Sequence, residues 1–166
     1  MKILGFIILA CAGPFTLLGQ GPVHVTSAKI LEAGIYSAQV VAAKTNASGV
    51  QLQTLDELTL LQSTTNIPAR LGVRFGFRYR IVGSPPDVPI TLTLVGTHPP
   101  MTNSTGKVQT TFGYPLKSWI GQAYVSNALD KPSDLVTGVW KFELWYEGKF
   151  LCEQSFFVAP EEKRRR

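Results

Sequence analysis

The sequence predicts an all-β domain in which two antiparallel sheets of about eight strands pack as a sandwich. Three observations support this fold class. Apolar residues recur at every second position in most segments, which is the spacing of a strand with one buried face. Glycine and proline clusters separate these segments at short intervals, and no segment has a convincing helical spacing of apolar residues. Strands at regular spacing with such turns are typical of a β-sandwich.

The clearest strand pattern lies in residues 136–158, which predict a β-hairpin around Gly148. If the apolar sets of both arms face one core, the loop needs an odd number of residues. We therefore expect the loop Glu147-Gly148-Lys149, since three-residue hairpin loops commonly use a glycine at positive φ. The expected inward set is Val136, Trp140, Phe142, Leu144, Tyr146, Phe150, Cys152, Phe156 and Val158.

The second strongest strand pattern is in residues 70–83, where Leu71, Val73, Phe75, Phe77, Tyr79 and Ile81 share one face. In the remaining segments, apolar and polar residues also alternate between clusters of turn residues. In chain order we expect two short strands in 23–43 divided at Gly34, a strand in 50–65, an extended lead-in at 66–68, a turn at 84–87, a strand at 89–95, a polar loop at 98–106, strands at 108–114 and 119–125, and a turn at 130–134.

The N-terminal residues have the layout of a secretory signal, with Lys2 followed by an apolar stretch and small residues. We expect a signal peptide in 1–21, a single β-sandwich domain in 22–160 and a disordered basic tail in 161–166. The protein is then periplasmic or secreted. In the alternative interpretation the segment is a lipoprotein signal, and a lipid on Cys11 anchors the protein to a membrane.

The charge of the chain argues against nucleic acid as a partner. The chain has 16 Lys and Arg against 11 Asp and Glu, with a pI near 9.4. Lys2 and the four basic residues of the tail lie outside residues 22–160, which hold 11 basic and 9 acidic residues. A domain so close to neutral is not expected to capture polyanions by its field.

Residues that carry chemistry are few, and we expect no catalytic activity, no cofactor and no metal. The two histidines, His24 and His98, stand in no pattern with serine or cysteine, and no zinc or phosphate-loop motif is present. Cys152 is expected on the inward face of its strand as a small buried hydrophobe, and not as a reactive thiol.

An arginine row is the first candidate for a binding site. Arg74, Arg78 and Arg80 lie on the face opposite the apolar set, and the last two form a small cationic patch. Such a patch binds a carboxylate, a sulfated or phosphorylated glycan, or an acidic protein surface. The alternative is a solvated sheet face paired with local acids such as Glu143.

Exposed aromatic residues are the second candidate. Trp145 falls on the face opposite the apolar set of its strand, and Trp119 and Tyr124 precede a loop. Aromatic rings on a sheet stack on sugars or anchor a protein partner. The alternative is that both faces of the strand carrying Trp145 are covered.

Two stretches resemble an uncharacterised bacterial family of exported proteins, domain of unknown function 3859. They are residues 64–76 (TTNIPARLGVRFG) and 138–157, which begins GVWKFE, and Ile35-Tyr36 is similar to the start of that domain. The resemblance covers about residues 28–158. It implies an immunoglobulin-like sandwich in the bacterial cell envelope and transfers no active site.

Together these observations predict an exported, non-catalytic binding or interaction module of the cell envelope. Its expected partner is another envelope protein or a glycan. The alternative is a carbohydrate-binding or accessory domain of an envelope hydrolase system.

Overall fold

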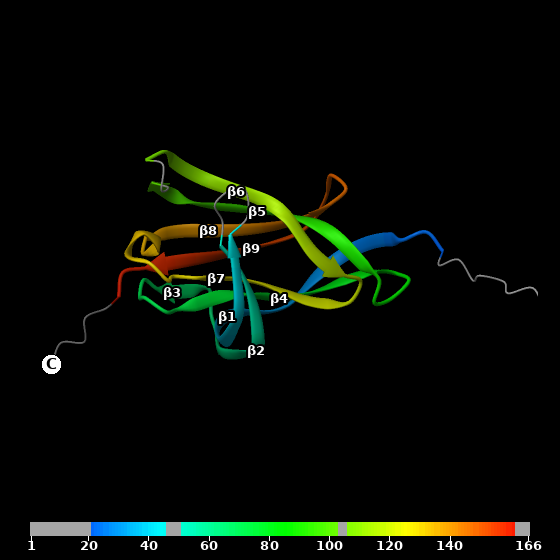
Figure 1. Cartoon of the computed structure of the whole chain (residues 1–166), viewed down its shortest axis with the longest axis horizontal. Helices are drawn as coiled ribbons and strands as arrows, with labels where there is room; N and C mark the ends of the chain where they lie inside the picture. Colours follow the sequence, from blue (N-terminus) through cyan, green and yellow to red (C-terminus); the bar gives the residue numbers. More distant parts are fainter. Residues whose placement is uncertain (1–20, 46–50, 103–105, 162–166) are drawn as a thin grey trace, which may run out of the picture.

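A computed structural model describes residues 21–45, 51–102 and 106–161, in which nine strands form two sheets (Figure 1). The predicted all-β sandwich is confirmed. The described residues contain one short 3₁₀ helix, η1 (Pro132–Asp134), which lies in the turn expected at 130–134. No helix in this part of the chain has the length and apolarity needed to cross a membrane.

The first sheet has four antiparallel strands in the order β2-β1-β4-β7. These strands are β2 (Gln51–Ser63), β1 (His24–Thr45), β4 (Arg74–Ser84) and β7 (Gln122–Ala128). The expected break at Gly34 is wrong, because β1 runs through it as one strand that pairs first with β4 and then with β2. At Gly34 both neighbours are present, and a Cβ there would lie 1.9 Å from the Gln62 carbonyl oxygen. The missing side chain thus permits the close approach of β2.

The second sheet has five strands in the order β3-β9-β8-β5-β6. These strands are β3 (Asn66–Pro68), β9 (Lys149–Ala159), β8 (Gly138–Tyr146), β5 (Pro89–Thr102) and β6 (Val108–Trp119). Only the β3–β9 pair is parallel. The polar loop expected at 98–106 is wrong in its first half, since His98 to Thr102 belong to β5. His98 continues the inward alternation of that strand and stacks on Phe112.

The core lies between the sheets and contains the inward residues expected from the period of two. Phe75 of β4 is its centre, with ring centroids 6.0 Å from Trp140, 6.1 Å from Phe142 and 5.1 Å from Phe156. Burying one such side chain contributes about 1.5–3 kcal/mol. Leu71 departs from the expectation because it lies in a turn before β4, where its side chain is 49% exposed.

The final hairpin differs from the expected three-residue loop. Glu147 and Gly148 form a two-residue turn with φ of 47° and 79°, so that Tyr146 faces Lys149. Positive φ at both central residues is the geometry that suits the twist of a tight hairpin. A β-bulge at Leu151 then restores the register, so Leu144 still faces Cys152. The expected inward position of Phe150 is therefore wrong, because Phe150 pairs with Trp145 on the outer face and is 45% exposed.

Candidate functional site

The chain passes from one sheet to the other at a tight corner between β6 and β7. Ile120 and Gly121 form this corner, and four backbone hydrogen bonds hold it: Ile120 N–H to Val88 O (2.9 Å), Asp87 N–H to Ile120 O (2.8 Å), Ile81 N–H to Gly121 O (2.8 Å) and Gly121 N–H to Ile81 O (3.1 Å). Gly121 has a φ of 141°, which residues with a side chain rarely adopt. The corner therefore fixes where Trp119, the last residue of β6, lies.

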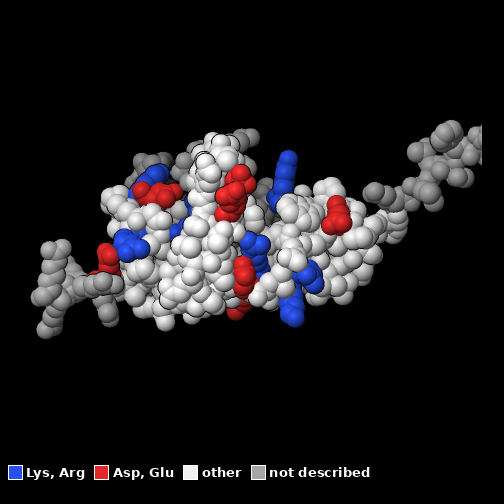
Figure 2. Space-filling model, turned by 90° about the horizontal axis from the view of Figure 1, so that it is seen from below, with Lys and Arg blue, Asp and Glu red and all other residues white. Residues whose placement is uncertain are grey.

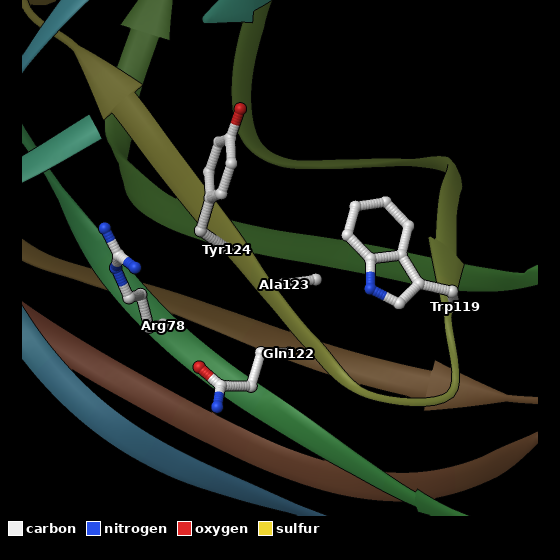
Figure 3. A pocket seen from close by; sticks show the side chains of 5 residues that line it. All are labelled: Arg78, Trp119, Gln122, Ala123 and Tyr124. Atoms are coloured by element: carbon white, nitrogen blue, oxygen red, sulfur yellow. The ribbon is translucent and has the colours of Figure 1, made fainter. Parts of the chain in front are cut away.

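A small hollow lies beside this corner, at the edge of the first sheet. Its volume is about 80 Å³, and it is open to solvent; we call it the β7 hollow. Figure 3 shows Ala123 between the indole of Trp119 on one side and Arg78 and Tyr124 on the other. The hollow is lined by Arg78, Trp119, Gln122, Ala123 and Tyr124.

Three of the residues that the sequence suggests as binding residues therefore meet at one place. Arg78 comes from β4, Tyr124 faces it across the β4–β7 pair, and Trp119 comes from the end of β6. Trp119 is 45% exposed, whereas Tyr124 and Arg78 are half-buried. The hollow thus combines a cation with two aromatic rings.

Arg78 is held in place from the side away from β7. Its Nε lies 2.9 Å from Glu32 Oε1 in an ion pair, but the Nε–H bond does not point at this oxygen and makes no hydrogen bond. Its Nη2 donates a hydrogen bond to the Leu58 carbonyl oxygen. A guanidinium has five N–H donors, so these contacts orient it without using all of its donors.

The expected pairing of the arginine row with Glu143 is wrong. Glu143 lies on the outer face of the other sheet, where it forms an ion pair with Lys141 and accepts a hydrogen bond from Trp145 Nε1 at 3.1 Å. These contacts lower the pKa of the Glu143 carboxyl, first through the Lys141 hydrogen bond. Glu32 takes the place beside Arg78 because β1 pairs with β4 in the register that sets them opposite.

The other two arginines of the row have different surroundings. Arg74 is buried, with 8% of its surface exposed, and donates to Ser126 Oγ at 3.2 Å. Burial lowers the pKa of its guanidinium, which Asp130 and Tyr124 counteract. Arg80 is exposed and lies between Lys29 of β1 and Gln122 of β7. The row is therefore one structural arginine, one at the hollow and one on the open surface.

Tyr36 and Glu32 are members of this cluster that sequence reasoning missed. The Tyr36 hydroxyl lies 3.4 Å from Glu32 Oε1 as a donor, and burial, with the Glu32 charge, raises the pKa of Tyr36 to about 12. Both belong to the part of β1 opposite Arg74 and Arg78. Only the register between β1 and β4 brings them there, and no local pattern carries that register.

Trp145 lies on the outer face of the second sheet, away from the β7 hollow, as its position in the alternation predicts. It is half-buried, and its ring packs edge-to-face on Phe150 with centroids 5.4 Å apart. Its Nε1 is already engaged with Glu143. The structure thus gives Trp145 an aromatic neighbour and does not bring it together with Trp119.

The remaining candidate groups have structural surroundings. His98 is buried against the rings of Phe112 and Trp140, and its Nδ1 lies 2.7 Å from Pro99 O. Burial raises the pKa of the Cys152 thiol to about 11, so the thiolate is scarce near neutral pH. The residues that the structure describes contain no group of three or more His, Cys, Asp or Glu side chains placed to hold a metal.

The surface charge agrees with the near-neutral composition of the domain. Figure 2 shows basic and acidic side chains interspersed over the face seen from below. Any attraction of a charged ligand on this face therefore comes from local groups and not from a field of one sign.

Sequence comparison matches residues 24–158 to a family described as domain of unknown function (DUF3859). Among solved structures, an immunoglobulin-like protein from Pseudomonas aeruginosa is similar, with a TM-score of 0.59 and 26% sequence identity. The match covers 85% of this chain and 99% of that one, and identifies the sandwich as immunoglobulin-like. No curated protein matches the chain.

Proposed function

The chain belongs to the DUF3859 family, and from this premise and the site geometry we propose that it is an exported, non-catalytic module that binds another envelope protein. The observation that carries this proposal is the β7 hollow, where Arg78, Trp119 and Tyr124 converge from three strands. The ligand is an acidic side chain presented by the partner.

The size of the hollow favours a partner protein over a small molecule. Pockets for drug-sized ligands have volumes of about 300–1,000 Å³. The β7 hollow has about 80 Å³, which is room for a single side-chain group. A ligand that is anchored by one group needs the rest of its binding surface elsewhere, as a protein partner has.

The lining of the hollow favours a carboxylate as that group. An oriented guanidinium forms charge-assisted, bidentate hydrogen bonds with carboxylates. Tryptophan, tyrosine and arginine are also the residues that most often dominate protein interfaces, because large rings give much contact area for little loss of side-chain freedom. Arg78 beside Trp119 and Tyr124 offers this combination.

The proposed location rests on the N-terminal sequence. Residues 1–20 lie outside the described part of the chain, so the secretory signal and the lipid on Cys11 stay predictions. An exported protein reaches envelope partners in either case, in solution after ordinary cleavage or at a membrane after lipidation.

A carbohydrate-binding accessory domain is the second candidate. It is supported by the exposed indole of Trp119 and by the Trp145–Phe150 pair on the opposite side of the sandwich. Aromatic rings of this kind stack on sugars. Titration of tryptophan fluorescence with peptidoglycan fragments and polysaccharides tests it, and a flat response counts against it.

The test of the proposed function uses the exported full-length protein and a charge placed inside the hollow. Gln122→Glu changes one lining residue to its acidic isostere and should repel a carboxylate. Gln109→Glu is the matched control, because it adds the same charge on an exposed position of β6. Trp119→Ala, with Trp145→Ala as its control, tests the aromatic part.

We expect Gln122→Glu and Trp119→Ala to retain at most a tenth of the envelope protein captured by the wild type in quantitative crosslinking. The two control variants should capture as much as the wild type. Equal capture by Gln122→Glu and Gln109→Glu, both at wild-type level, would overturn the proposed carboxylate site.

A further inference from the structure

We propose that the free edge of β7 receives an extended segment of the partner protein as a fifth strand of the first sheet. The identity of the partner as a protein rests on the proposed function. The binding mode rests on a different set of observations, namely an unpaired strand edge and a partly covered row of apolar side chains opposite it.

The two sheets do not end at the same place. β4 lies over β8 and β9, as the contacts of Phe75 show, and β1 lies over the β9 side, where Lys149 Nζ donates to Thr26 O at 2.8 Å. β7 follows β4 on the other side and is the last strand of its sheet. It therefore lies toward β5, and β6 extends past it with no described strand opposite.

The inward side chains of β6 are correspondingly less buried than those of its neighbour. Leu92 and Leu94 of β5 are fully buried, whereas Leu116, Tyr114 and Phe112, which face Leu92, Leu94 and Gly96, are only half-buried. Ser118 is buried, but it lies next to the corner, where it contacts Tyr79. Cover is thus lost as β6 runs away from the corner, and Figure 1 shows β6 and β7 diverging there.

The backbone of β7 offers the hydrogen bonds that an added strand needs. Ile81 and Gly121 exchange both backbone bonds, and Leu129 N–H donates to Val73 O in the same unbroken register. In an antiparallel ladder the bonded pairs alternate, so residues 123, 125 and 127 bond to β4. The N–H and C=O groups of Gln122, Tyr124, Ser126 and Ala128 therefore point to the free edge.

A segment that joins this edge would lie opposite the overhanging part of β6. Every second side chain would face inward onto Phe112, Tyr114 and Leu116 and favour apolar residues. The side chains between them would face outward beside Gln122 and Tyr124 of β7, and Arg80 and Arg78 of β4 lie one strand further, opposite these two residues. The occupant we infer is thus an extended segment with alternating apolar and acidic residues.

A second copy of this chain fits the edge less well. The inward residues of its own β7, such as Val125, are buried in its own core and cannot cover Phe112 or Tyr114 of the first copy. Pairing of two copies through this edge would also place the arginine side chains of β4 from both copies near one another. An extended segment of another protein can cover these rings with its apolar side chains and can place acidic side chains on the outer face.

The test uses the full-length protein and a synthetic nine-residue peptide in which valine alternates with glutamate. Hydrogen exchange of the backbone amides is the direct measurement. We expect the peptide to slow exchange at residues 122, 124, 126 and 128 at least tenfold, because these amides gain partners. The amides of residues 123, 125 and 127 are already bonded and should change less.

Ser126→Pro removes one outward N–H without touching the bonds to β4, and proline is tolerated on an edge strand. Ser126→Ala is the matched control, since both variants lose the hydroxyl that accepts from Arg74. Peptide binding should weaken at least tenfold in the proline variant relative to the alanine variant. If the proline variant does not fold, a peptide with alternate N-methylated amides makes the same comparison on the wild type.

The outcomes separate this inference from the proposed function. Unchanged exchange at the four amides, equal binding by the proline and alanine variants, or no binding at about 1 mM peptide overturns strand addition. A monomer–dimer equilibrium abolished by Ser126→Pro overturns it in favour of a second copy. If a valine–lysine peptide binds as tightly as the glutamate peptide and still protects the four amides, strand addition stands and the carboxylate site fails.

Discussion

Removal of the Tyr79 hydroxyl should destabilise the protein at neutral pH and protect it at high pH. Tyr79 is 1% exposed, and its hydroxyl lies 3.1 Å from Ser118 Oγ, near the corner that supports the β7 hollow. Tyr79→Phe loses this hydrogen bond and leaves the Ser118 hydroxyl buried, which costs about 1–2 kcal/mol.

The protection at high pH follows from the pKa of the same group. Burial raises the pKa of Tyr79 from 10.0 to about 12. A pKa that is higher in the folded state means that the neutral phenol is favoured there, so its contribution is complete below pH 10 and is lost as pH rises toward 12. At about 1.4 kcal/mol per pKa unit, the wild type should lose about 1.4 kcal/mol by pH 11 relative to Tyr79→Phe.

The assay is urea unfolding, followed by tryptophan fluorescence, at pH 7, 9, 10 and 11 for both proteins. A Cys152→Ala background removes the nearby thiol, whose charge also affects Tyr79. Losses from Tyr36 and Tyr114 are common to both proteins and cancel in the difference. The two stabilities should become equal near pH 11. If the difference in free energy of unfolding between the two proteins stays constant from pH 7 to pH 11, the raised pKa of Tyr79 is refuted, and with it the exclusion of water from this part of the core.

Two further predictions concern the corner and the hairpin. Gly121→Ala places a Cβ about 3.2 Å from Trp119 Cδ1 at a φ of 141°, and should destabilise the protein by about 1–3 kcal/mol in urea unfolding and shift the Trp119 emission. Gly113→Ala is its control, since the added Cβ meets only Leu94 O at 3.7 Å, and similar losses in both variants would contradict the special role of the corner. Deletion of Leu151 removes the bulge and should leave the pairs Leu144–Cys152 and Trp145–Phe150 intact, at a cost of about 1–2 kcal/mol for the lost apolar contact. In a Cys11→Ser background, Cys152 should react slowly with a thiol reagent both before and after the deletion, and fast labelling after it would show that the strand has slipped by one residue.

The final hairpin shows how far local pattern carries. The inward positions of Trp140, Phe142, Leu144 and Phe156 follow from the period of two, and the structure confirms them. The expected three-residue loop is wrong because a loop with an odd number of residues is required only when the pairing of the two arms is unbroken. One extra residue at Leu151 brings the apolar sets of both arms to the same face although the turn has only two residues. A bulge of this kind leaves no sign in the alternation of the other residues.

The candidate site was predictable only in its parts. Arg78, Trp119 and Tyr124 stand out in the sequence because of their side-chain chemistry and their positions on strands. Their meeting depends on the corner at Ile120 and Gly121 and on the β4–β7 register. Glu32 as the partner of Arg78 depends on the β1–β4 register. Both registers join segments far apart in the chain.

The sequence by itself determined the fold class, the inward faces of the main strands and the inward position of Cys152, which is half-buried against the core. These properties are local, because the two faces of a strand are distinguished by the hydrophobicity of successive residues. Apart from the pairing of the two arms of the final hairpin, the tertiary structure alone decided which strands are neighbours, where the sheets end and which side chains meet. The β7 hollow and the free edge of β7 belong to this second group, since strand pairing depends on contacts between distant segments that no local period records.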